Sequence, residues 1–258
     1  MEIHIKKAVK AGNSSAVILP RSWLDREVRI ELIEKTPEKI LIDTLEIIKK
    51  HLNVDKIIGI YLVGSHARGD YDKDSDIDIL VVTDDTDKEM ISEGVYNILI
   101  VSSELLSQKL SQDLFPIGQM IREAKPLLNS SYLKSVNVKV TRKNISWYID
   151  TTEDKLRLIK RAMDLSIKKN NYLSDLVAYT LILRIRTLYI IERLIKNQDY
   201  SKKEFLKLIG KVSHTPNPYE RYLAVKNNLE ITDGLSIEEA ERLYDYLKSQ
   251  LARIQKMI

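Results

Sequence analysis

The stretch GSHARGDYDKDSDID, residues 64–78, gathers glycine, hydroxyl, guanidinium and carboxylate groups between two apolar runs. The run KIIGIYLV precedes it and the run ILVV follows it, so both flanks are expected to be buried strands. Side chains two residues apart in a strand project to the same face, which places Asp76 and Asp78 together, about 7 Å apart. Burying two like charges is unfavourable unless a partner offsets them. The pair therefore predicts a cation site.

Other groups in this stretch suit a phosphorylated ligand. Gly64 lets the backbone approach a phosphate closely. Ser65 offers a hydroxyl and a backbone N–H at the start of an expected helical turn. Arg68 can balance triphosphate charge with its planar guanidinium. Carboxylate oxygens suit Mg²⁺, which keeps water and phosphate oxygens as its other ligands, so the whole set indicates phosphoryl or nucleotidyl transfer.

An acidic surface loop is the other interpretation of the same residues. A regular calcium-binding hand needs glycine at about position six and glutamate at about position twelve of its loop. Counted from Asp70, these positions hold Ser75 and Val81. A solvated loop also leaves the carboxylates inside an apolar strand without an explanation, so the transfer chemistry is favoured.

The sequence GSHARGDYDKDSDIDILVV resembles the signature of the DNA polymerase β-like nucleotidyltransferase superfamily, in particular its minimal and kanamycin-nucleotidyltransferase types. The resemblance covers roughly residues 37–130. It implies a nucleoside triphosphate substrate, Mg²⁺ or Mn²⁺ as cofactor, and transfer of a nucleoside monophosphate with release of pyrophosphate. By position, it implies that Gly64 and Ser65 hold the triphosphate and that Asp76 and Asp78 hold the metal.

One departure from this pattern concerns a third carboxylate, which such enzymes usually carry on the next strand. In GVYNILIVS the residue at the expected place is Asn97. An amide binds a metal weakly and cannot accept the proton of an attacking hydroxyl. Asn97 is therefore a third candidate metal ligand but not a base. Glu93, just before the strand, is an alternative base, and the loop carboxylates Asp70, Asp72 and Asp74 are further candidates if the loop rearranges.

Two functions follow from this departure. One is a nucleotidyltransferase acting on a protein, small-molecule or nucleic-acid acceptor, in a toxin–antitoxin or regulatory setting. The other is a catalytically weak or inactive regulator or antitoxin that senses nucleotide and binds DNA.

The elements expected around the motif give an α+β chain in three parts: 1–35, 36–137 and 138–258. The middle part is expected to be a mixed-sheet α/β nucleotidyltransferase domain, with Thr36 as N-cap of its first helix. Its expected elements are a helix over 38–53, strands over 56–63, 77–82 and 94–102, and a helix over 103–112.

The third part is expected to be a helical bundle around a long apolar helix over 173–196. Three Ser/Thr-x-x-Asp/Glu patterns predict helix starts, at Thr151–Asp154, Ser201–Glu204 and Ser236–Glu239. The segment SHTPNPYERY is expected to be the main loop between helices.

The first part carries strand-like segments over 2–12, 16–19 and 27–34, a turn at Gly12 and a helical turn in RSWLD. Its sequence KAGNSSAVILPRSWL resembles the AbrB/MazE-like swapped-hairpin modules. That resemblance implies an intertwined homodimer with a basic face for DNA. The candidate phosphate contacts are Lys6, Lys7, Lys10 and Arg21. The alternative is that these charges are solvated and the module only dimerises.

The amino-acid composition excludes several classes of protein. Of 258 residues, 44% are hydrophobic and 30% charged, and the formal net charge of +4 is too small to indicate nucleic-acid binding by itself. There is no cysteine, which excludes disulfides and thiolate metal sites. No apolar run approaches the roughly 20 residues of a membrane span, so a cytoplasmic protein without a membrane partner is expected.

Overall fold

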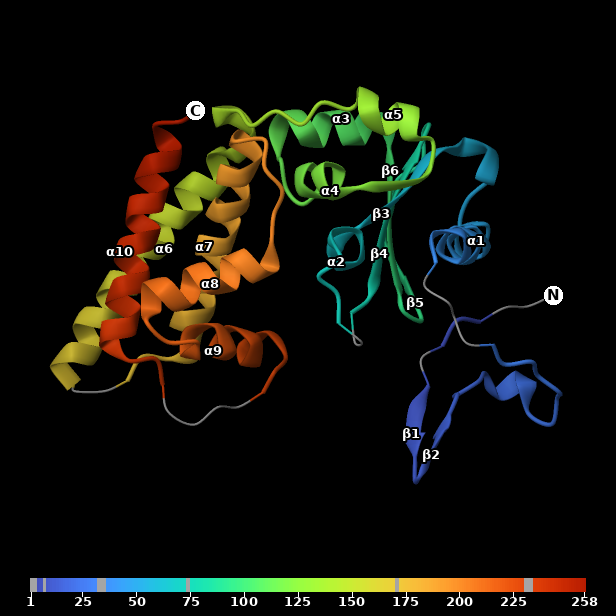
Figure 1. Cartoon of the computed structure of the whole chain (residues 1–258), viewed down its shortest axis with the longest axis horizontal. Helices are drawn as coiled ribbons and strands as arrows, with labels where there is room; N and C mark the ends of the chain where they lie inside the picture. Colours follow the sequence, from blue (N-terminus) through green and yellow to red (C-terminus); the bar gives the residue numbers. More distant parts are fainter. Residues whose placement is uncertain (1–3, 7, 32–35, 73–74, 170–171, 230–233) are drawn as a thin grey trace. The chain divides into compact units, whose positions relative to one another are not determined.

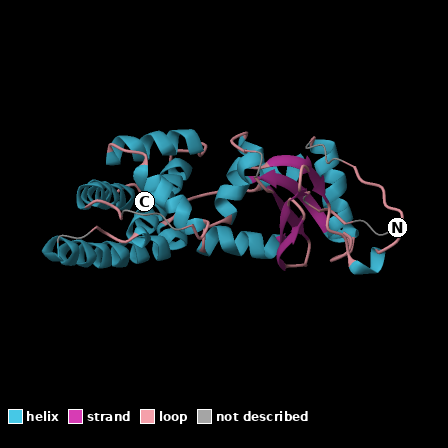
Figure 2. Ribbon diagram, turned by 90° about the horizontal axis from the view of Figure 1, so that it is seen from below, coloured by secondary structure: helices cyan, strands magenta, loops and turns pink. Residues whose placement is uncertain are grey.

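The computed structural model describes residues 4–6, 8–31, 36–72, 75–169, 172–229 and 234–258. The chain divides into two compact units, one formed by Met1–Gln108 with Glu123–Asn137 and the other by Lys109–Arg122 with Val138–Ile258. Figure 2 shows the strands of the larger sheet gathered in the first unit, while the second is built from helices. The expected combination of an N-terminal hairpin, a mixed sheet and C-terminal helices is confirmed. The three-part domain division stays a prediction.

The N-terminal segment forms a short hairpin (Figure 1). Strand β1 (Val9–Ala11) pairs antiparallel with β2 (Ser14–Ala16), and the 3-10 helix η1 (Arg21–Trp23) follows as expected. Gly12 makes the turn with φ +59°. Of the strand expected over 16–19, only Ala16 is in a strand, as the last residue of β2. Of the strand expected over 27–34, residues 27–31 form no strand and 32–34 lie outside the described residues. A strand requires a neighbouring strand to accept its backbone hydrogen bonds, and the described chain provides none here.

The larger sheet has the order β5-β6-β4-β3-β7. Only β4 and β6 are parallel, and the other neighbours are antiparallel. The strands expected from the sequence are confirmed, whereas two edge strands were not expected. The bounds are β3 (Ile57–Val63), β4 (Ile77–Thr83), β5 (Lys88–Glu93), β6 (Tyr96–Ser102) and β7 (Lys125–Leu128).

Helix α1 (Pro37–Ile48) determines which face of the sheet is apolar core. The hydroxyl of Thr36 accepts a hydrogen bond from the backbone N of Lys39 at 3.3 Å, so the expected N-cap is confirmed. Apolar residues of α1 form one buried cluster with Ile77 and Ile79 of β4. Because side chains alternate along a strand, Asp76 and Asp78 belong to the opposite face. Figure 1 shows α1 on one side of the sheet and α2 on the other.

Short helices precede and follow the strands along the chain. Helix α2 (Gly64–Arg68) follows β3 directly, in the place where a helical turn was expected. The other short elements are η2 (Val54–Lys56), α3 (Ser103–Gln112), α4 (Ile117–Glu123) and α5 (Ser130–Ser135). The end of α3 and all of α4 except Glu123 belong to the helical unit. Helix α3 has the bounds that the sequence predicts.

The helical unit packs around α7, whose buried side chains belong to a single apolar cluster with those of its neighbours. Its helices are α6 (Arg142–Lys169), α7 (Asp175–Ile195), α8 (Lys202–Ser213), α9 (Asn217–Lys226) and α10 (Ile237–Gln255). No helix in the described part of the chain is both long and apolar enough to span a membrane.

Helix starts in this unit were predicted with mixed success. The capping box of Ser236 and Glu239 is present, and Ser201 caps α8. The helix start expected at Thr151 is wrong, because α6 continues through this residue. The hydroxyl of Thr151 does not cap a helix but donates to the carbonyl of Trp147. The expected loop SHTPNPYERY contains most of α9, because Pro218 lies in the first helical turn, where a missing N–H is tolerated.

Candidate functional site

The two motif carboxylates lie at the start of β4. Asp76 immediately precedes the strand and is exposed, whereas Asp78 is half-buried. Asp78 is opposite Val63 of antiparallel β3 and beside Asn97 of parallel β6. The two strands that flank β4 therefore bring Gly64, which follows Val63, and Asn97 to either side of Asp78.

Gly64 is packed directly against Asp78. A Cβ atom on Gly64 would overlap Oδ2 of Asp78 and lie 3.0 Å from its Cγ. The backbone of Gly64 also has φ +67°, which residues with a side chain rarely adopt. Both constraints require glycine here. Ser65 follows as the second residue of α2 and is partly exposed.

Asn97 connects the neighbouring polar side chains. Its Nδ2 donates to Oδ2 of Asp76 at 3.3 Å, and its Oδ1 accepts from the hydroxyl of Ser92 at 2.8 Å. In this orientation Asn97 is a donor to a carboxylate, and it would have to turn its amide to ligate a metal. Ser92 was missed by the sequence reasoning, because β5 itself was not expected.

The electrostatic environment of Asp78 favours a bound cation. Burial is the main cause that raises the pKa of its carboxyl, and the negative charges of Asp76 and Glu123 raise this pKa further. A hydrogen bond from Asn97 and the charge of Arg68 act in the opposite direction but do not cancel the rise. A cation between the carboxylates would relieve this repulsion.

Arg68 is engaged by two acidic side chains. Its Nη1 lies 2.7 Å from Oε2 of Glu123, and its Nη2 lies 3.1 Å from Oδ1 of Asp70. Glu123 also accepts a hydrogen bond from the backbone N of Gly64 at 2.7 Å. Nothing in the local sequence of α4 points to Glu123, because its partners are distant along the chain.

The alternative base, Glu93, lies on the other face of the sheet. It is paired with Tyr96, whose ring is buried against α1, and its carboxylate lies 2.8 Å from Nζ of Lys50. Asn97, in contrast, is paired with Ser92. The structure therefore separates Glu93 from Asp76 and Asp78, which rules it out as their neighbouring base.

The carboxylates of Asp76 and Asp78 fit Mg²⁺ if water and substrate supply its other ligands. Among the described residues, which do not include Asp74, there is no group of three or more histidine and acidic side chains that could hold a metal ion. Mg²⁺ is commonly held by one or two carboxylates, and water and substrate phosphates complete its ligands. Asp76 and Asp78 provide that minimal pair, with the uncompensated charge that such an ion would neutralise.

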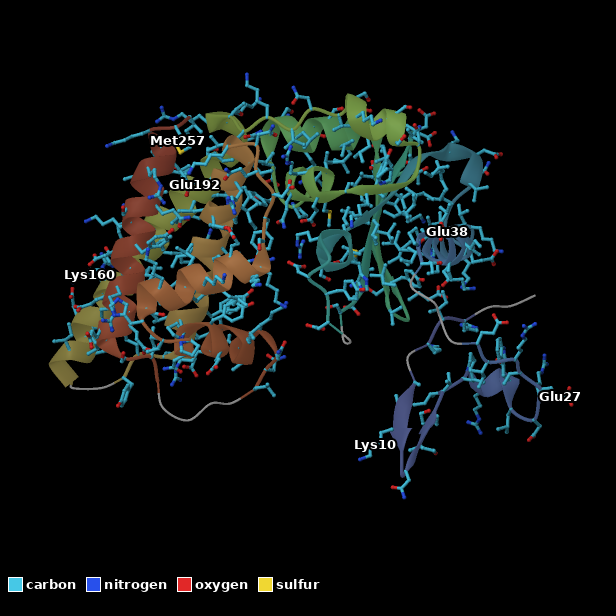
Figure 3. The ribbon with its side chains drawn as sticks, in the orientation of Figure 1. Lys10, Glu27, Glu38, Lys160, Glu192 and Met257 are labelled. Carbon is cyan, nitrogen blue, oxygen red and sulfur yellow. The ribbon has the colours of Figure 1, made fainter. Side chains whose placement is uncertain are left out.

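The candidate DNA contacts lie in the N-terminal segment. Lys6, Lys10 and Arg21 are exposed, and Figure 3 shows the side chain of Lys10 directed outward from β1. Lys7 lies outside the described residues. Exposure is compatible with phosphate contacts and equally with solvated charges, so this assignment stays a prediction.

Comparison with known proteins identifies the protein family to which the chain belongs. The nucleotidyltransferase domain family matches residues 41–207, more than half of the chain. The chain belongs to this family. No curated protein matches it.

Two solved structures resemble the fold at low sequence identity. A nucleotidyltransferase-like protein from Exiguobacterium sibiricum 255-15 is 12% identical with a TM-score of 0.39, over 83% of this chain and 75% of that one. A spectinomycin adenyltransferase, AAD(9), from Enterococcus faecialis, solved with ATP and spectinomycin, is 15% identical with a TM-score of 0.42, over 82% of this chain and 98% of that one.

Proposed function

We propose that the chain moves a nucleoside monophosphate from a nucleoside triphosphate to an acceptor, with Mg²⁺ or Mn²⁺ held by Asp76 and Asp78. The observation that carries this proposal is the placement of both carboxylates on the face of β4 opposite α1, with Gly64 packed against Asp78. Membership of the nucleotidyltransferase domain family supports nucleotidyl transfer in general.

The reaction requires one bond to form and one to break. An acceptor oxygen attacks the α-phosphorus, the bond from this phosphorus to the bridging oxygen breaks, and pyrophosphate leaves with the bonding electrons. The proton of the attacking hydroxyl passes to solvent or to a carboxylate, because the amide of Asn97 cannot accept it. When bound, the divalent cation neutralises phosphate charge and polarises the reacting oxygens.

The residues of the chain have separate roles in this proposal. Asp76 and Asp78 hold the cation. Gly64 and Ser65 bind the phosphates through backbone N–H groups and a hydroxyl. Asn97 orients Asp76 through the hydrogen bond that it donates.

The proposal is tested with α-labelled nucleoside triphosphates, Mg²⁺ or Mn²⁺, and cell lysate as the source of acceptor. Label transfer is expected with the wild-type chain and at least a hundredfold less with Asp78→Asn. Asp84→Asn, an identical change at an exposed position just after β4, is expected to transfer normally. Sensitivity of the product to protease or nuclease reports the acceptor class, including a toxin protein. Absence of any labelled product with both metals would contradict the proposal.

A second candidate function is a nucleotide-sensing, DNA-binding regulator or antitoxin. The observation that favours it is Asn97 hydrogen-bonded to Asp76 where a third carboxylate was expected. This function predicts nucleotide binding without label transfer. It also predicts duplex DNA binding that weakens steeply with salt, because phosphate contacts release counterions.

The N-terminal segment supports a homodimer under either function. Ile18, Leu24 and Ile30 are 71%, 73% and 67% exposed, which is unusual for three large apolar side chains in one short segment. A second copy of the same segment would bury them and offer pairing partners to residues 17–19 and 27–31, which form no strand in the single chain.

A further inference from the structure

Glu123, at the end of α4, contacts Gly64, which the proposed function assigns to phosphate, and Arg68, which the sequence predicts to balance triphosphate charge. Its Oε1 accepts a hydrogen bond from the backbone N of Gly64 at 2.7 Å, and its Oε2 accepts one from Nη1 of Arg68 at 2.7 Å. Its side chain is 7% exposed and that of Arg68 is 13% exposed. All three residues belong to the same compact unit. A buried carboxylate thus engages two donors at the edge of the site.

A carboxylate and a phosphate compete for such donors. Both are anions that present several acceptor oxygens, and both form short, charge-assisted bonds with a guanidinium. A glycine amide without a neighbouring side chain is equally open to either anion. The hydrogen bonds that Glu123 accepts from Gly64 and Arg68 are of the kind that a phosphate would accept from the same donors.

We propose that Glu123 is an internal occupant of the phosphate-binding donors, and that the triphosphate of the nucleotide replaces its carboxylate on Gly64 and Arg68. This inference rests on the proposed function, because it assumes that the nucleotide binds at this motif. It makes Glu123 a residue that sets nucleotide affinity by competition, without contact to the reacting atoms.

The charge of Glu123 is the property that matters. Asp76, Asp78 and Glu123 are carboxylates near one another, and the charge of Glu123 contributes to the electrostatic destabilisation of ionised Asp78. An arriving triphosphate adds further negative charge to this group. Replacing Glu123 with glutamine keeps its shape and one acceptor oxygen but removes the repulsion and weakens its hold on Arg68.

The test compares Glu123→Gln with a matched control, Glu93→Gln. Glu93 has an ion pair with Lys50 in the same unit but on the α1 face of the sheet, so the control makes the same chemical change away from the site. Isothermal titration measures binding of ATP and of inorganic tripolyphosphate, each with Mg²⁺. We expect Glu123→Gln to bind both at least about fivefold more tightly than the wild-type chain, and Glu93→Gln to bind within about twofold of it.

The outcomes separate this inference from the proposed function. If the wild-type chain binds ATP and Glu123→Gln binds it equally or more weakly, Glu123 is a structural brace and the inference is wrong, while the proposed function stands. If neither protein binds ATP or tripolyphosphate, both are wrong.

A second measurement needs no variant and remains informative if Glu123→Gln folds poorly. In the wild-type chain labelled with ¹⁵N-glycine, saturating Mg²⁺ and tripolyphosphate should shift the amide signal of Gly64. Gly94, which also has positive φ but is packed against Ile5, provides the control signal that should not move. An unmoved Gly64 signal at saturation overturns the inference.

Discussion

Gly64 and Asp78 pack so closely that a Cβ atom on the glycine would overlap a carboxylate oxygen of the aspartate. Their contact joins the start of α2 to β4, and it fixes the Gly64 end of the motif relative to the carboxylates. The site can therefore be disturbed at Gly64 without removal of any charged group.

We predict that Gly64→Ala loses at least about tenfold in affinity for Mg²⁺–ATP, because the added methyl displaces Asp78. Gly69→Ala is the control, since Gly69 has φ +76° and no atom within 4 Å of an added Cβ. Both variants should lose about 1 kcal/mol of stability from positive φ, with a further loss for Gly64→Ala. Thermal unfolding and isothermal titration measure the two effects. Equal affinities in the two variants would show that the close contact has no role in binding.

For Asn97→Asp, we predict an increase in label transfer of at least about tenfold, because a carboxylate can accept the proton that an amide cannot. The new charge beside Asp76 should also increase the Mn²⁺ affinity. Asn53→Asp, the same change at the exposed N-cap of η2, is the control. If label transfer in Asn97→Asp is unchanged, the lack of a third carboxylate does not limit the rate of transfer. That result would favour the sensing function.

We predict that Tyr61 makes the fold sensitive to alkaline pH. Burial raises the pKa of its hydroxyl to about 12, and this hydroxyl donates to the carbonyl of Asn129 at 3.1 Å. The unfolded chain ionises near the ordinary value of about 10. This contribution to stability is therefore fully present below pH 10 and is lost as the pH rises towards 12, by up to about 2 kcal/mol.

Urea unfolding at several values between pH 9 and 11.5 measures the slope of stability against pH. Tyr61→Phe should flatten this slope relative to the wild-type chain. A slope that is identical in the two proteins would contradict the assignment of the raised pKa to Tyr61.

We predict that the full chain sediments as a dimer at micromolar concentration and that deletion of residues 1–35 gives a monomer. The reason is that a dimer interface would bury the exposed apolar side chains of that segment. Lys10→Glu should weaken duplex DNA binding without changing the sedimentation. A monomeric full chain would contradict the dimer, and a DNA affinity that does not respond to salt would contradict the phosphate contacts.

Much of the sheet-containing part follows from local sequence. Helix α1 is marked by its Thr36 cap and one apolar face, and β3, β4 and β6 are runs of aliphatic residues. Strand β5, KEMISE, lacks such a run, and β7 is only four residues long and contains a proline. These edge strands exist because the central strands offer them hydrogen-bonding partners, which is information that local sequence does not contain.

In the candidate site, too, some features follow from local sequence and others depend on the tertiary fold. Asp76 and Asp78 are two residues apart, so the period of a strand was sufficient to predict that they share a face. The packing of Gly64 against Asp78 was not predicted, because it depends on the pairing of β3 with β4. Glu123 contacts Gly64 across 59 residues of sequence, and its own sequence neighbours give no signal. Contacts of this kind depend on the tertiary fold, which periodicity and spacing do not determine.

The most direct test of the account is Mn²⁺ binding, measured by electron paramagnetic resonance with and without ATP. We predict that the wild-type chain binds Mn²⁺ in the presence of ATP, that Asp78→Asn weakens this binding at least about tenfold, and that Asp84→Asn leaves it unchanged. Mn²⁺ binding that is equally strong in Asp78→Asn would contradict the account, because the cation would then not be held by the aspartate packed against Gly64.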